Sequence, residues 1–343
     1  MRAVYKTRRE PGAIEVREVD EPRPGPDDLL IRVQAGSICG SDVHVYRYSH
    51  GFEYIQPPFI LGHEFTGVVE ACGERVKEFR VGDRVVSEGV HYCGECPACR
   101  TGHTNQCRRF RIIGLHFDGG FAEYACFPAR YAHRIPKAVP PEWAALVEPA
   151  SVAVHAVRRG PELLASSAVV VTGVGPIGLM VAQVARRSGA GQVLVTGLDA
   201  DEEKRLPIAR ELGLQVINVE RQDLGQAVKD LADGYGADVV FECSGSSRAL
   251  LQALDLVRKG GQVILVGIQS QTTEVYFTPL IRREISIHSA FCSTWVDFEA
   301  AIGMLSRREL SVGPLITTFA LDKAEEALEA SFNRQVGKAV LMP

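Results

Sequence analysis

Residues 168–187 read AVVVTGVGPIGLMVAQVARR, and this stretch decides the fold. Ala168–Thr172 is a short apolar run rich in β-branched side chains, which predicts a buried strand. The residues from Ile177 to Arg187 have the apolar spacing of a helix. A Gly-x-Gly-x-x-Gly turn lies between the two. A strand, a glycine turn and a helix in this order are typical of a dinucleotide-binding unit, in which the helix N-terminus faces a pyrophosphate.

The glycine turn supplies the first candidate cofactor-binding residues. Gly173 permits the tight turn, Gly175 lets the backbone approach the pyrophosphate, and Gly178 allows the helix to pack closely on the strand. Pro176 and Ile177 open the helix. We therefore expect these five residues to contact a dinucleotide.

The alternation of strands and helices continues toward the C-terminus and predicts a doubly wound parallel sheet over residues 151–288. The further predicted strands are Val193–Thr196, Val216–Asn218, Ala237–Phe241 and Gln262–Val266, and the further predicted helices are Glu202–Leu212, Asp223–Asp233 and Arg248–Val257. Ligands of such sheets bind at the carboxyl ends of the strands. Ser244, Val266, Gly267 and Ile268 lie at two of these ends, so we expect them to contact the cofactor.

The choice between NAD and NADP depends on the residues that follow the second strand. An acidic residue about 20 positions after the glycine turn would bind the ribose hydroxyls of NAD, and Asp199 is the candidate although the strand runs into Gly197. If Gly197 instead makes room for a 2′-phosphate, Lys204 or Arg205 would hold it and NADP would fit. The acidic residues at 201–203 favour NAD, so we expect NAD, with NADP as the alternative.

The remainder of the chain predicts a second domain that is rich in β-structure. A length of 343 residues suggests two domains. Residues 1–150 contain short strand-like runs separated by Gly and Pro, which indicates a small β-barrel or sandwich. These runs are Ala13–Val19, Leu29–Ala35, Thr66–Cys72, Gly82–Val86 and Phe121–Phe127. A predicted helix, Asp297–Arg307, and an apolar run, Lys338–Leu341, follow the parallel sheet.

Four of the nine cysteines lie within one short loop, at Cys93, Cys96, Cys99 and Cys107. Four thiolates at this spacing can surround one tetrahedral Zn²⁺ and leave no open position. The alternative is four unrelated thiols, but such crowding has no other stable use in a reducing compartment. We therefore predict a structural zinc site.

A second, open metal site is suggested by ligands on three separate segments: Cys39, the pair His63-Glu64, and Glu148 before a proline. Thiolate, imidazole and carboxylate together suit zinc, and three protein ligands would leave a position for water or substrate. Taken singly, Cys39 also fits a buried small residue, His63 a hydrogen-bonded histidine and Glu148 a helix-start carboxylate. Spacing alone does not decide whether these segments meet.

Five motifs in one fixed order resemble the zinc-dependent medium-chain dehydrogenase/reductase family over essentially the whole chain. They are Cys39-x-Ser41-x-x-His44, Gly62-His63-Glu64, the four-cysteine loop, the segment Glu148-Pro149-Ala150-Ser151-Val152, and the glycine turn. The Glu148–Val152 segment is similar to that of the polyol (sorbitol/L-iditol-type) branch, as is Cys292-Ser293-Thr294-Trp295. The run from Ile38 to Tyr46 is also similar to L-threonine 3-dehydrogenases.

The resemblance implies an architecture and a chemistry. A GroES-like catalytic domain would span residues 1–150 and carry both zinc sites, a Rossmann domain would span 151–288, and residues 289–343 would return to the catalytic domain. Cys39, His63 and Glu64 would bind catalytic zinc, with Glu148 linked through water or exchanging with Glu64. Ser41 and His44 would form a proton relay from the alcohol, and subunits would associate as homodimers or homotetramers.

These features favour a zinc- and NAD(P)-dependent dehydrogenase that oxidises a secondary alcohol of a polyol or sugar-like substrate. The alternative within enzymes is an L-threonine 3-dehydrogenase-like activity. The alternative outside enzymes is a zinc-containing dinucleotide-binding protein without turnover, in which only the cysteine loop would bind metal.

The composition argues against several other classes of protein. Lys and Arg number 38 against 42 Asp and Glu, a net charge of −4, so no basic excess is available to bind nucleic acid. The charged N-terminus is unlike a signal peptide. The uncharged run around the glycine turn is better explained by a strand–turn–helix than by a membrane span. We expect a cytoplasmic protein that does not contact membranes.

Overall fold

The computed structural model describes residues 1–269 and 271–343, which form two compact units. Unit 1 comprises Met1–Ser151, Thr294–Arg308 and Leu315–Pro343, and unit 2 comprises Val152–Ser293 and Glu309–Pro314. The return to the first unit therefore begins at Thr294 rather than at residue 289, and the short segment 309–314 was not expected in unit 2.

Side-chain contacts explain why residues 309–314 belong to unit 2. The amide of Gln183 accepts a hydrogen bond from the Ser311 N–H at 2.9 Å and donates one to the Ser311 carbonyl at 3.1 Å. Arg187 pairs with Glu309 at 2.6 Å. The helix that follows the glycine turn thus binds residues 309–314 through the side chains of Gln183 and Arg187. Periodicity in the sequence does not reveal such long-range contacts.

Unit 2 is built on a six-stranded parallel sheet with the order β13-β12-β11-β14-β15-β16. The strands are β11 (Ala168–Thr172), β12 (Gln192–Gly197), β13 (Gln215–Asn218), β14 (Ala237–Glu242), β15 (Val257–Leu265) and β16 (Ser286–Ser289). The strand order reverses between β11 and β14, which is the point where doubly wound sheets bind dinucleotides. The predicted doubly wound sheet is confirmed.

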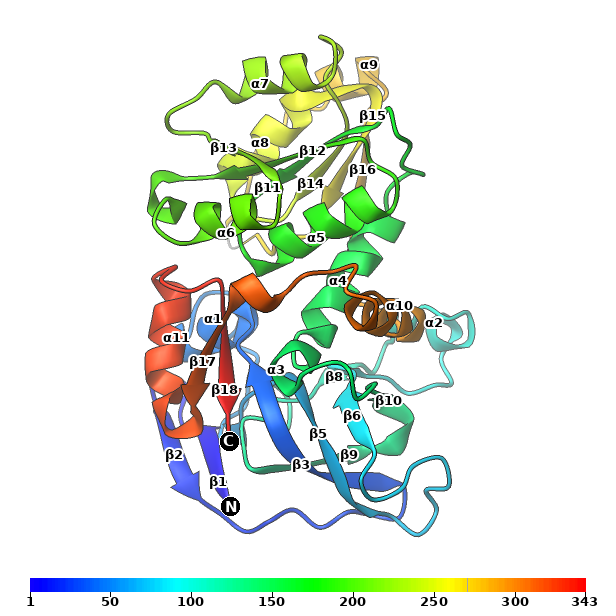
Figure 1. Ribbon diagram of the computed structural model, residues 1–343, viewed down its shortest axis with the longest axis vertical. Helices are drawn as coiled ribbons and strands as arrows, with labels where there is room; N and C mark the ends of the chain where they lie inside the picture. Colours follow the sequence, from blue (N-terminus) through cyan, green and yellow to red (C-terminus); the bar gives the residue numbers. More distant parts are fainter. Residues whose placement is uncertain (270) are drawn as a thin grey trace. The chain divides into compact units, whose positions relative to one another are not determined.

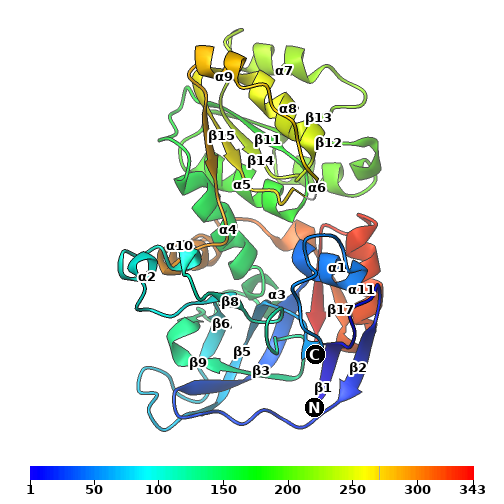
Figure 2. The same cartoon turned by 180° about the vertical axis from the view of Figure 1, so that it is seen from behind.

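Helices cover both faces of this sheet. They are α5 (Pro176–Arg187), α6 (Arg205–Glu211), α7 (Leu224–Leu231), α8 (Ser247–Leu256) and α9 (Thr278–Arg282), with a short 3-10 turn at Asp199–Asp201. α5 and α6 lie on one face and α7 and α8 on the other, as Figures 1 and 2 show from opposite sides. α5 buries Leu179, Met180 and Val181 together with most of the following turn, because its apolar residues recur at helical spacing.

Three boundaries in unit 2 differ from the predictions. The helix expected at Glu202–Leu212 begins only at Arg205, since the Asp201 carboxylate accepts the Leu198 N–H at 3.0 Å and stabilises a turn there instead. β15 is longer than Gln262–Val266 and starts at Val257, after the end of α8. The edge strand β16 was not predicted, because its half-polar sequence carries little apolar alternation.

Unit 1 contains a seven-stranded sheet and two smaller ones. The order in the large sheet is β10-β6-β5-β3-β18-β17, with β9 also paired to β3. The strands of unit 1 are β1 (Arg2–Lys6), β2 (Ile14–Glu18), β3 (Asp28–Ser37), β4 (Phe59–Ile60), β5 (Glu64–Cys72), β6 (Arg84–Ser87), β7 (Val90–His91), β8 (Arg111–Ile112), β9 (Tyr124–Pro128), β10 (Ala132–Arg134), β17 (Ile316–Ala320) and β18 (Lys338–Met342). The expected β-rich domain is confirmed. Two of its strands start later than predicted, because Ala13 (φ 49°) and Gly82 (φ 91°) have left-handed backbone conformations.

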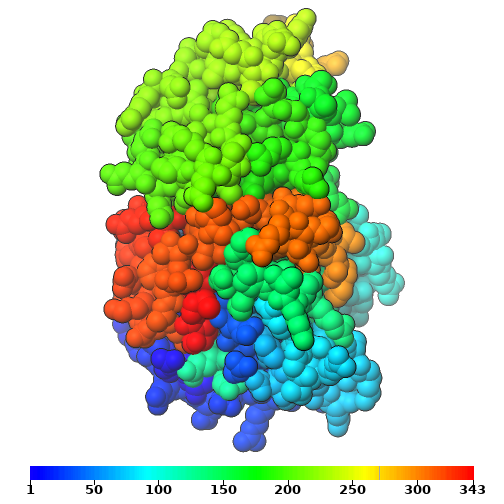
Figure 3. All heavy atoms as spheres, in the orientation of Figure 1, coloured from blue at the N-terminus to red at the C-terminus, as the bar shows by residue number. Residues whose placement is uncertain are grey.

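The C-terminal segment completes unit 1 by adding strands next to the N-terminal ones. β18 pairs antiparallel with β3 through Val340 and Ser37, and Figure 3 shows red C-terminal residues beside blue N-terminal ones. The helices of unit 1 are α1 (Gly40–Arg47), α2 (Pro97–Arg100), α3 (Pro141–Ala144), α10 (Trp295–Ser306) and α11 (Ala324–Phe332), and α4 (Val147–Arg158) starts in unit 1 and ends in unit 2. Short 3-10 turns occupy Thr104–Gln106, Ala129–Tyr131, Gly313–Leu315 and Leu321–Lys323.

One apolar core joins distant parts of unit 1. Val45 of α1, Leu328 of α11 and Leu341 of β18 are fully or almost fully buried in the same cluster. Across residues 1–269 and 271–343, the helices are too short or too polar to cross a bilayer.

Candidate functional site

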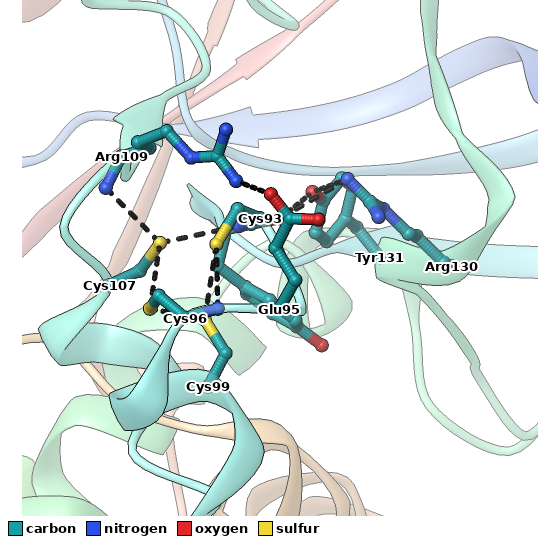
Figure 4. Close-up of polar contacts among 9 residues, drawn as sticks. Cys93, Glu95, Cys96, Cys99, Cys107, Arg109, Arg130 and Tyr131 are labelled. Atoms are coloured by element: carbon teal, nitrogen blue, oxygen red, sulfur yellow. Dashed lines mark hydrogen bonds and ion pairs between the residues drawn. The ribbon is translucent and has the colours of Figure 1, made fainter.

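The four loop cysteines face one another, as Figure 4 shows. Cys93 precedes α2, Cys96 and Cys99 lie at its start and within it, and Cys107 follows the 3-10 turn. Their sulfur atoms all lie within 4.8 Å of one another, and three of the separations are 3.5, 3.9 and 4.0 Å. Sulfurs at the corners of a tetrahedron with Zn–S bonds of about 2.3 Å would be separated by about 3.8 Å. The donor set therefore fits zinc with no open position.

Backbone amides also face the sulfurs. The Cys93 and Arg109 N–H groups donate to the Cys107 sulfur at 3.3 Å, and the Cys96 N–H donates to the Cys93 sulfur at 3.4 Å. A contact with Arg109 lowers the pKa of Cys93 to about 6, so this thiol ionises readily. Such donors stabilise thiolates, the form in which cysteine binds metal.

Replacing Cys96 by alanine is expected to remove one zinc per chain and lower the thermal midpoint by roughly 5 °C or more, because the loop loses the ion that holds it. Metal analysis and calorimetry would measure both effects. Cys126→Ala, which removes a thiol of β9 outside the loop, is the control. An unchanged zinc content in Cys96→Ala would contradict the assignment.

The second predicted site forms within unit 1. Cys39, directly before α1, lies with His63 and Glu64, at the start of β5, so that the three ligand atoms are within 4.8 Å of one another. Two of the segments that the sequence left unconnected therefore meet. Cys39 comes near Glu64 because it follows the end of β3, and β3 pairs with β5 in the register that places Ser37 opposite Glu64.

Asp42 orients His63 and was missed by the sequence analysis. The two side chains are buried, with His63 Nδ1 3.6 Å from Asp42 Oδ1, and within residues 1–269 and 271–343 neither atom has a hydrogen-bond partner. Asp42 Oδ2 accepts the Cys39 N–H at 2.8 Å. A carboxylate behind one ring nitrogen is the arrangement that leaves the other nitrogen free for a metal. Its only sequence signal is an acidic residue in the first turn of a helix.

The charges around His63 favour a cation. Burial lowers the pKa of His63, but the negative charges of Asp42 and Cys39 outweigh burial and raise it well above its usual value. Burial also raises the pKa of Asp42 to about 6. The negative charge of Asp42 thus stabilises positive charge on His63. The half-buried thiol of Cys39, together with the buried imidazole and carboxylate, fits a zinc ion with an open position.

Glu64 is engaged by residues that the sequence analysis did not identify. Lys338, buried on β18, donates to Glu64 Oε1 at 2.9 Å and lies 2.7 Å from Oε2, and the Ser37 hydroxyl also donates to Oε2. Burial lowers the pKa of Lys338, but the nearby Glu64 carboxylate outweighs it, so the net pKa is raised. A lysine inside an otherwise apolar strand was the one available signal for this ion pair.

Glu148 lies near this group but is not one of the three converging ligands. It is the second residue of α4 and is almost fully buried. Burial and the neighbouring charge of Glu64 raise its pKa to about 7. The Glu148 carboxyl also limits the space at Gly89, where a Cβ atom would lie 3.1 Å from Oε1. Within the described residues, the group whose ligand atoms all lie within 4.8 Å of one another contains Cys39, His63 and Glu64 but not Glu148.

The two predicted relay residues lie on α1. The Ser41 hydroxyl is 3.4 Å from His63 Nε2, so it lies beside the candidate metal site. His44 is half-buried and stacks on Phe52 with ring centroids 5.0 Å apart, and burial lowers its pKa. A lowered pKa keeps the imidazole neutral at pH 7 and able to accept a proton.

The glycine turn has the predicted geometry. Gly173 has φ 101° between β11 and α5, and Gly175 is the residue before α5, with Pro176 and Ile177 at its start. A Cβ atom at Gly178 would lie 1.9 Å from the Gly173 carbonyl oxygen, so the helix packs on the turn only with glycine there.

Asp199 lies among other acidic groups beyond the end of β12. Its carboxylate accepts hydrogen bonds from Asn218 at 2.7 Å and from Arg221 at 2.5 Å, and Asn218 also donates to Glu202. A Cβ atom at residue 197 would lie 2.9 Å from a methyl carbon of Leu206, so a side chain there would require Leu206 to shift. Arg205 opens α6 with its side chain mostly buried, 4.0 Å from Asp201.

The remaining cofactor candidates lie in the loops after β14 and β15. Val266 and Gly267 are partly buried, and Ser244 and Ile268 are exposed. Both loops contact Glu242, the last residue of β14, which the sequence analysis did not identify. The candidates therefore all lie at the carboxyl edge of the sheet in unit 2.

Comparisons with known proteins agree with this arrangement. The model of an alcohol dehydrogenase GroES-like domain matches residues 25–137, and the model of a zinc-binding dehydrogenase matches residues 176–307. A sorbitol dehydrogenase from Halalkalibacterium halodurans is 37% identical over 100% of this chain and 99% of its own length. An L-threonine 3-dehydrogenase from Pyrococcus furiosus is 38% identical over 100% of this chain and 98% of its own length.

Solved structures of two relatives share the fold. A zinc-binding dehydrogenase from Sinorhizobium meliloti bound to NADP has a TM-score of 0.90 at 32% identity, covering 100% of this chain and 99% of that one. An alcohol dehydrogenase from Escherichia coli in complex with NADH has a TM-score of 0.90 at 31% identity, with the same coverage.

The fold and the two metal-ligand groups define a zinc-dependent oxidoreductase of the alcohol dehydrogenase class. The chain belongs to the zinc-containing medium-chain alcohol dehydrogenase family. The family resemblance inferred from its motifs is confirmed.

Proposed function

We propose that this protein transfers a hydride from a secondary alcohol of a polyol or sugar-like substrate to NAD. The observation that carries the proposal is the convergence of Cys39, His63 and Glu64 within 4.8 Å. The sorbitol dehydrogenase at 37% identity and a galactitol-1-phosphate dehydrogenase from Escherichia coli with a TM-score of 0.89 support a polyol substrate.

The roles of the residues follow from their positions. Cys39, His63 and Glu64 would hold the catalytic zinc, with Glu148 as an exchanging or water-linked carboxylate. Zinc there would supply a Lewis acid that lowers the pKa of an alcohol hydroxyl. Asp42 holds the His63 ring, and Lys338 balances the charge of Glu64. Correct orientation of the substrate in the site would contribute to the rate in addition to these chemical roles.

Ser41 and His44 are proposed as the proton relay. Ser41 lies beside His63 and would take the proton of the alcohol hydroxyl. His44 would receive it, since its lowered pKa leaves the ring neutral at pH 7. No hydrogen bond joins Ser41 and His44 in the described part of the chain, so the relay needs a bridging group, such as a water molecule or a hydroxyl group, between them.

NAD is proposed as the preferred cofactor because Asp199, Glu202 and Glu220 cluster beyond the end of β12, where negative charge would repel a 2′-phosphate. The Asp199 N–H donates to Glu220 at 2.6 Å, and Arg221 is already paired with Asp199 and Glu202. NADP remains the alternative if Lys204 or Arg205 leaves its present surroundings to bind the phosphate. One of the two solved relatives was bound to NADP and the other was in complex with NADH.

Asp199→Ala is expected to lower the ratio of kcat/KM with NAD to kcat/KM with NADP by about tenfold or more, because a charged acceptor for the ribose hydroxyls is lost. Steady-state rates with each cofactor measure the ratio. Asp230→Ala, at an exposed position on α7, serves as the control. A ratio unchanged in Asp199→Ala would show that another residue selects the cofactor.

An L-threonine 3-dehydrogenase-like activity is the second candidate, supported by the relative that is 38% identical. Initial rates with polyols, inositols, sugar acids and L-threonine, each with NAD and NADP, separate the two. Turnover of polyols without turnover of threonine supports the proposal. Turnover of threonine with silent polyols reverses it.

Metal content tests the alternative of a binding protein without turnover. We propose two zinc ions per chain, and one zinc held by the cysteine loop alone would favour the alternative. The cytoplasm is the proposed location, without binding to nucleic acid or membranes. A homodimer or homotetramer is also proposed. The edge strand β16, with its half-exposed Ile287, offers an edge to which no other strand of the described residues pairs.

A further inference from the structure

Glu242 is a buried carboxylate to which the proposed function assigns no role. It is the last residue of β14, and its relative exposure is 0%. Burying a carboxylate is costly unless charge or hydrogen bonds compensate. Within residues 1–269 and 271–343, no lysine, arginine or histidine pairs with it. Hydrogen-bond donors must therefore stabilise this group.

Those donors come from three separate segments of unit 2. Glu242 Oε1 accepts from the Ser244 N–H at 2.8 Å, the Ser244 hydroxyl at 2.5 Å and the Gly245 N–H at 3.1 Å. The Thr172 hydroxyl, at the end of β11, lies 3.4 Å from the same oxygen. Oε2 accepts from the Gln269 amide at 3.1 Å. These hydrogen bonds compensate for the burial of the Glu242 carboxyl group.

The backbone of the loops after β14 and β15 packs closely around Glu242. The Glu242 carbonyl oxygen accepts the N–H groups of Val266 and Gly267, each at 2.8 Å. A Cβ atom at Gly267 would lie 2.2 Å from the Gly245 nitrogen and 2.9 Å from Glu242 Oε2. The backbones of the two loops therefore contact each other at Gly245 and Gly267, and the Glu242 carboxyl group contacts both loops.

The position of these loops relates Glu242 to one half of the cofactor. The strand order β13-β12-β11-β14-β15-β16 is that of two mononucleotide-binding halves, of which β14, β15 and β16 form the second. Asp199 follows β12 in the first half, whereas Ser244 and Gly267 follow strands of the second half. Loops at the carboxyl ends of the second half face the nicotinamide side of a dinucleotide.

We propose that Glu242 is a positioning residue that holds the two nicotinamide-side loops in their cofactor-binding conformation without touching the adenosine side. The proposal rests on the proposed use of a nicotinamide dinucleotide. A glutamine at this position keeps one oxygen acceptor for the Ser244 and Gly245 N–H groups. It replaces the other oxygen with an NH₂ group, which does not accept from Gly245 or Gln269, and it removes the charge. The loops would then separate, and the nicotinamide half of the cofactor would lose its contacts.

The test compares the whole cofactor with its adenosine half. Calorimetric titration of the full-length wild-type protein and Glu242→Gln with NADH and with AMP gives the four dissociation constants. We expect Glu242→Gln to weaken NADH binding by about tenfold or more, as for loss of a hydrogen-bonded charge, and to leave AMP binding within about twofold. Glu211→Gln, at an exposed position on α6, is the matched control and should change neither constant.

Each outcome of these titrations supports or overturns the proposed role of Glu242. Unchanged NADH binding overturns the proposal, and an equal loss of NADH and AMP binding overturns it as well, because that pattern marks a general defect of unit 2. If Glu242→Gln does not fold, Gln269→Leu removes one donor to Oε2 and should weaken NADH binding about threefold with AMP unchanged. Unchanged NADH binding in Gln269→Leu would then overturn it. Wild-type protein that binds AMP but neither NADH nor NADPH would instead contradict the proposed function.

Discussion

Cys39→Ser is expected to lower kcat by about a thousandfold or more and to leave the fold intact. Loss of a thiolate ligand weakens the proposed catalytic zinc site, and several kcal/mol of transition-state stabilisation are lost with the metal. The fold should persist, because Cys39 contributes its backbone N–H rather than its sulfur to the hydrogen bond with Asp42. Serine is itself a favourable residue at a helix N-cap.

Three measurements on Cys39→Ser distinguish the chemistry from the fold. Metal analysis should show one zinc per chain instead of two, kinetics should show the loss of kcat, and circular dichroism should be unchanged. Cys72→Ser, at the end of β5 and outside the ligand group, is the matched control. Near-full activity of metal-stripped Cys39→Ser would contradict the metal mechanism.

Lys338→Met is expected to lower the free energy of unfolding of unit 1 by about 3–5 kcal/mol, the usual cost of removing one partner from a buried ion pair. Lys338 and Glu64 are both buried and lie 2.7 Å apart. In protein depleted of the proposed catalytic zinc, on which the measurement is made, removal of the lysine leaves the Glu64 carboxylate without a cation. Fluorescence during urea unfolding reports on this unit, since both tryptophans, Trp143 and Trp295, belong to it.

A double-mutant cycle tests whether the cost comes from the pair. Glu64→Gln combined with Lys338→Met should recover much of the loss, because the uncompensated charge is gone. Lys323→Met, which removes an exposed lysine before α11, is the control and should cost little. A loss below about 1 kcal/mol in Lys338→Met would show that the pair contributes little.

Much of the fold could be predicted because it is specified by residues that are close together in the sequence. The run from Ala168 through Gly178 specifies a strand, a turn and a helix by residues that neighbour one another in sequence. The four cysteines of the loop close a site within fifteen residues, so their spacing alone predicts that their sulfurs meet. The β-rich character of the N-terminal part followed in the same way from alternation and turn residues.

The parts that could not be predicted depend on long-range pairing. Asp42 has no distinguishing pattern, and Lys338 lies 274 positions from the glutamate that it contacts. Glu242 was missed because a carboxylate at a strand end is ordinary until the loops that surround it are known. The assignment of residues 309–314 to unit 2 likewise follows from the contacts of Gln183 and Arg187.

The amino-acid sequence by itself determined the doubly wound sheet, the glycine turn and the cysteine loop, because each is specified by residues only a few positions apart. The tertiary structure decided that Cys39, His63 and Glu64 converge, that Asp42 and Lys338 support them, and that Glu242 joins two loops. Those contacts require β3, β5 and β18 to pair in register in unit 1 and β14 to lie beside β15 in unit 2. Such pairing depends on the packing of whole sheets, in which a shift of one residue would turn every side chain to the opposite face.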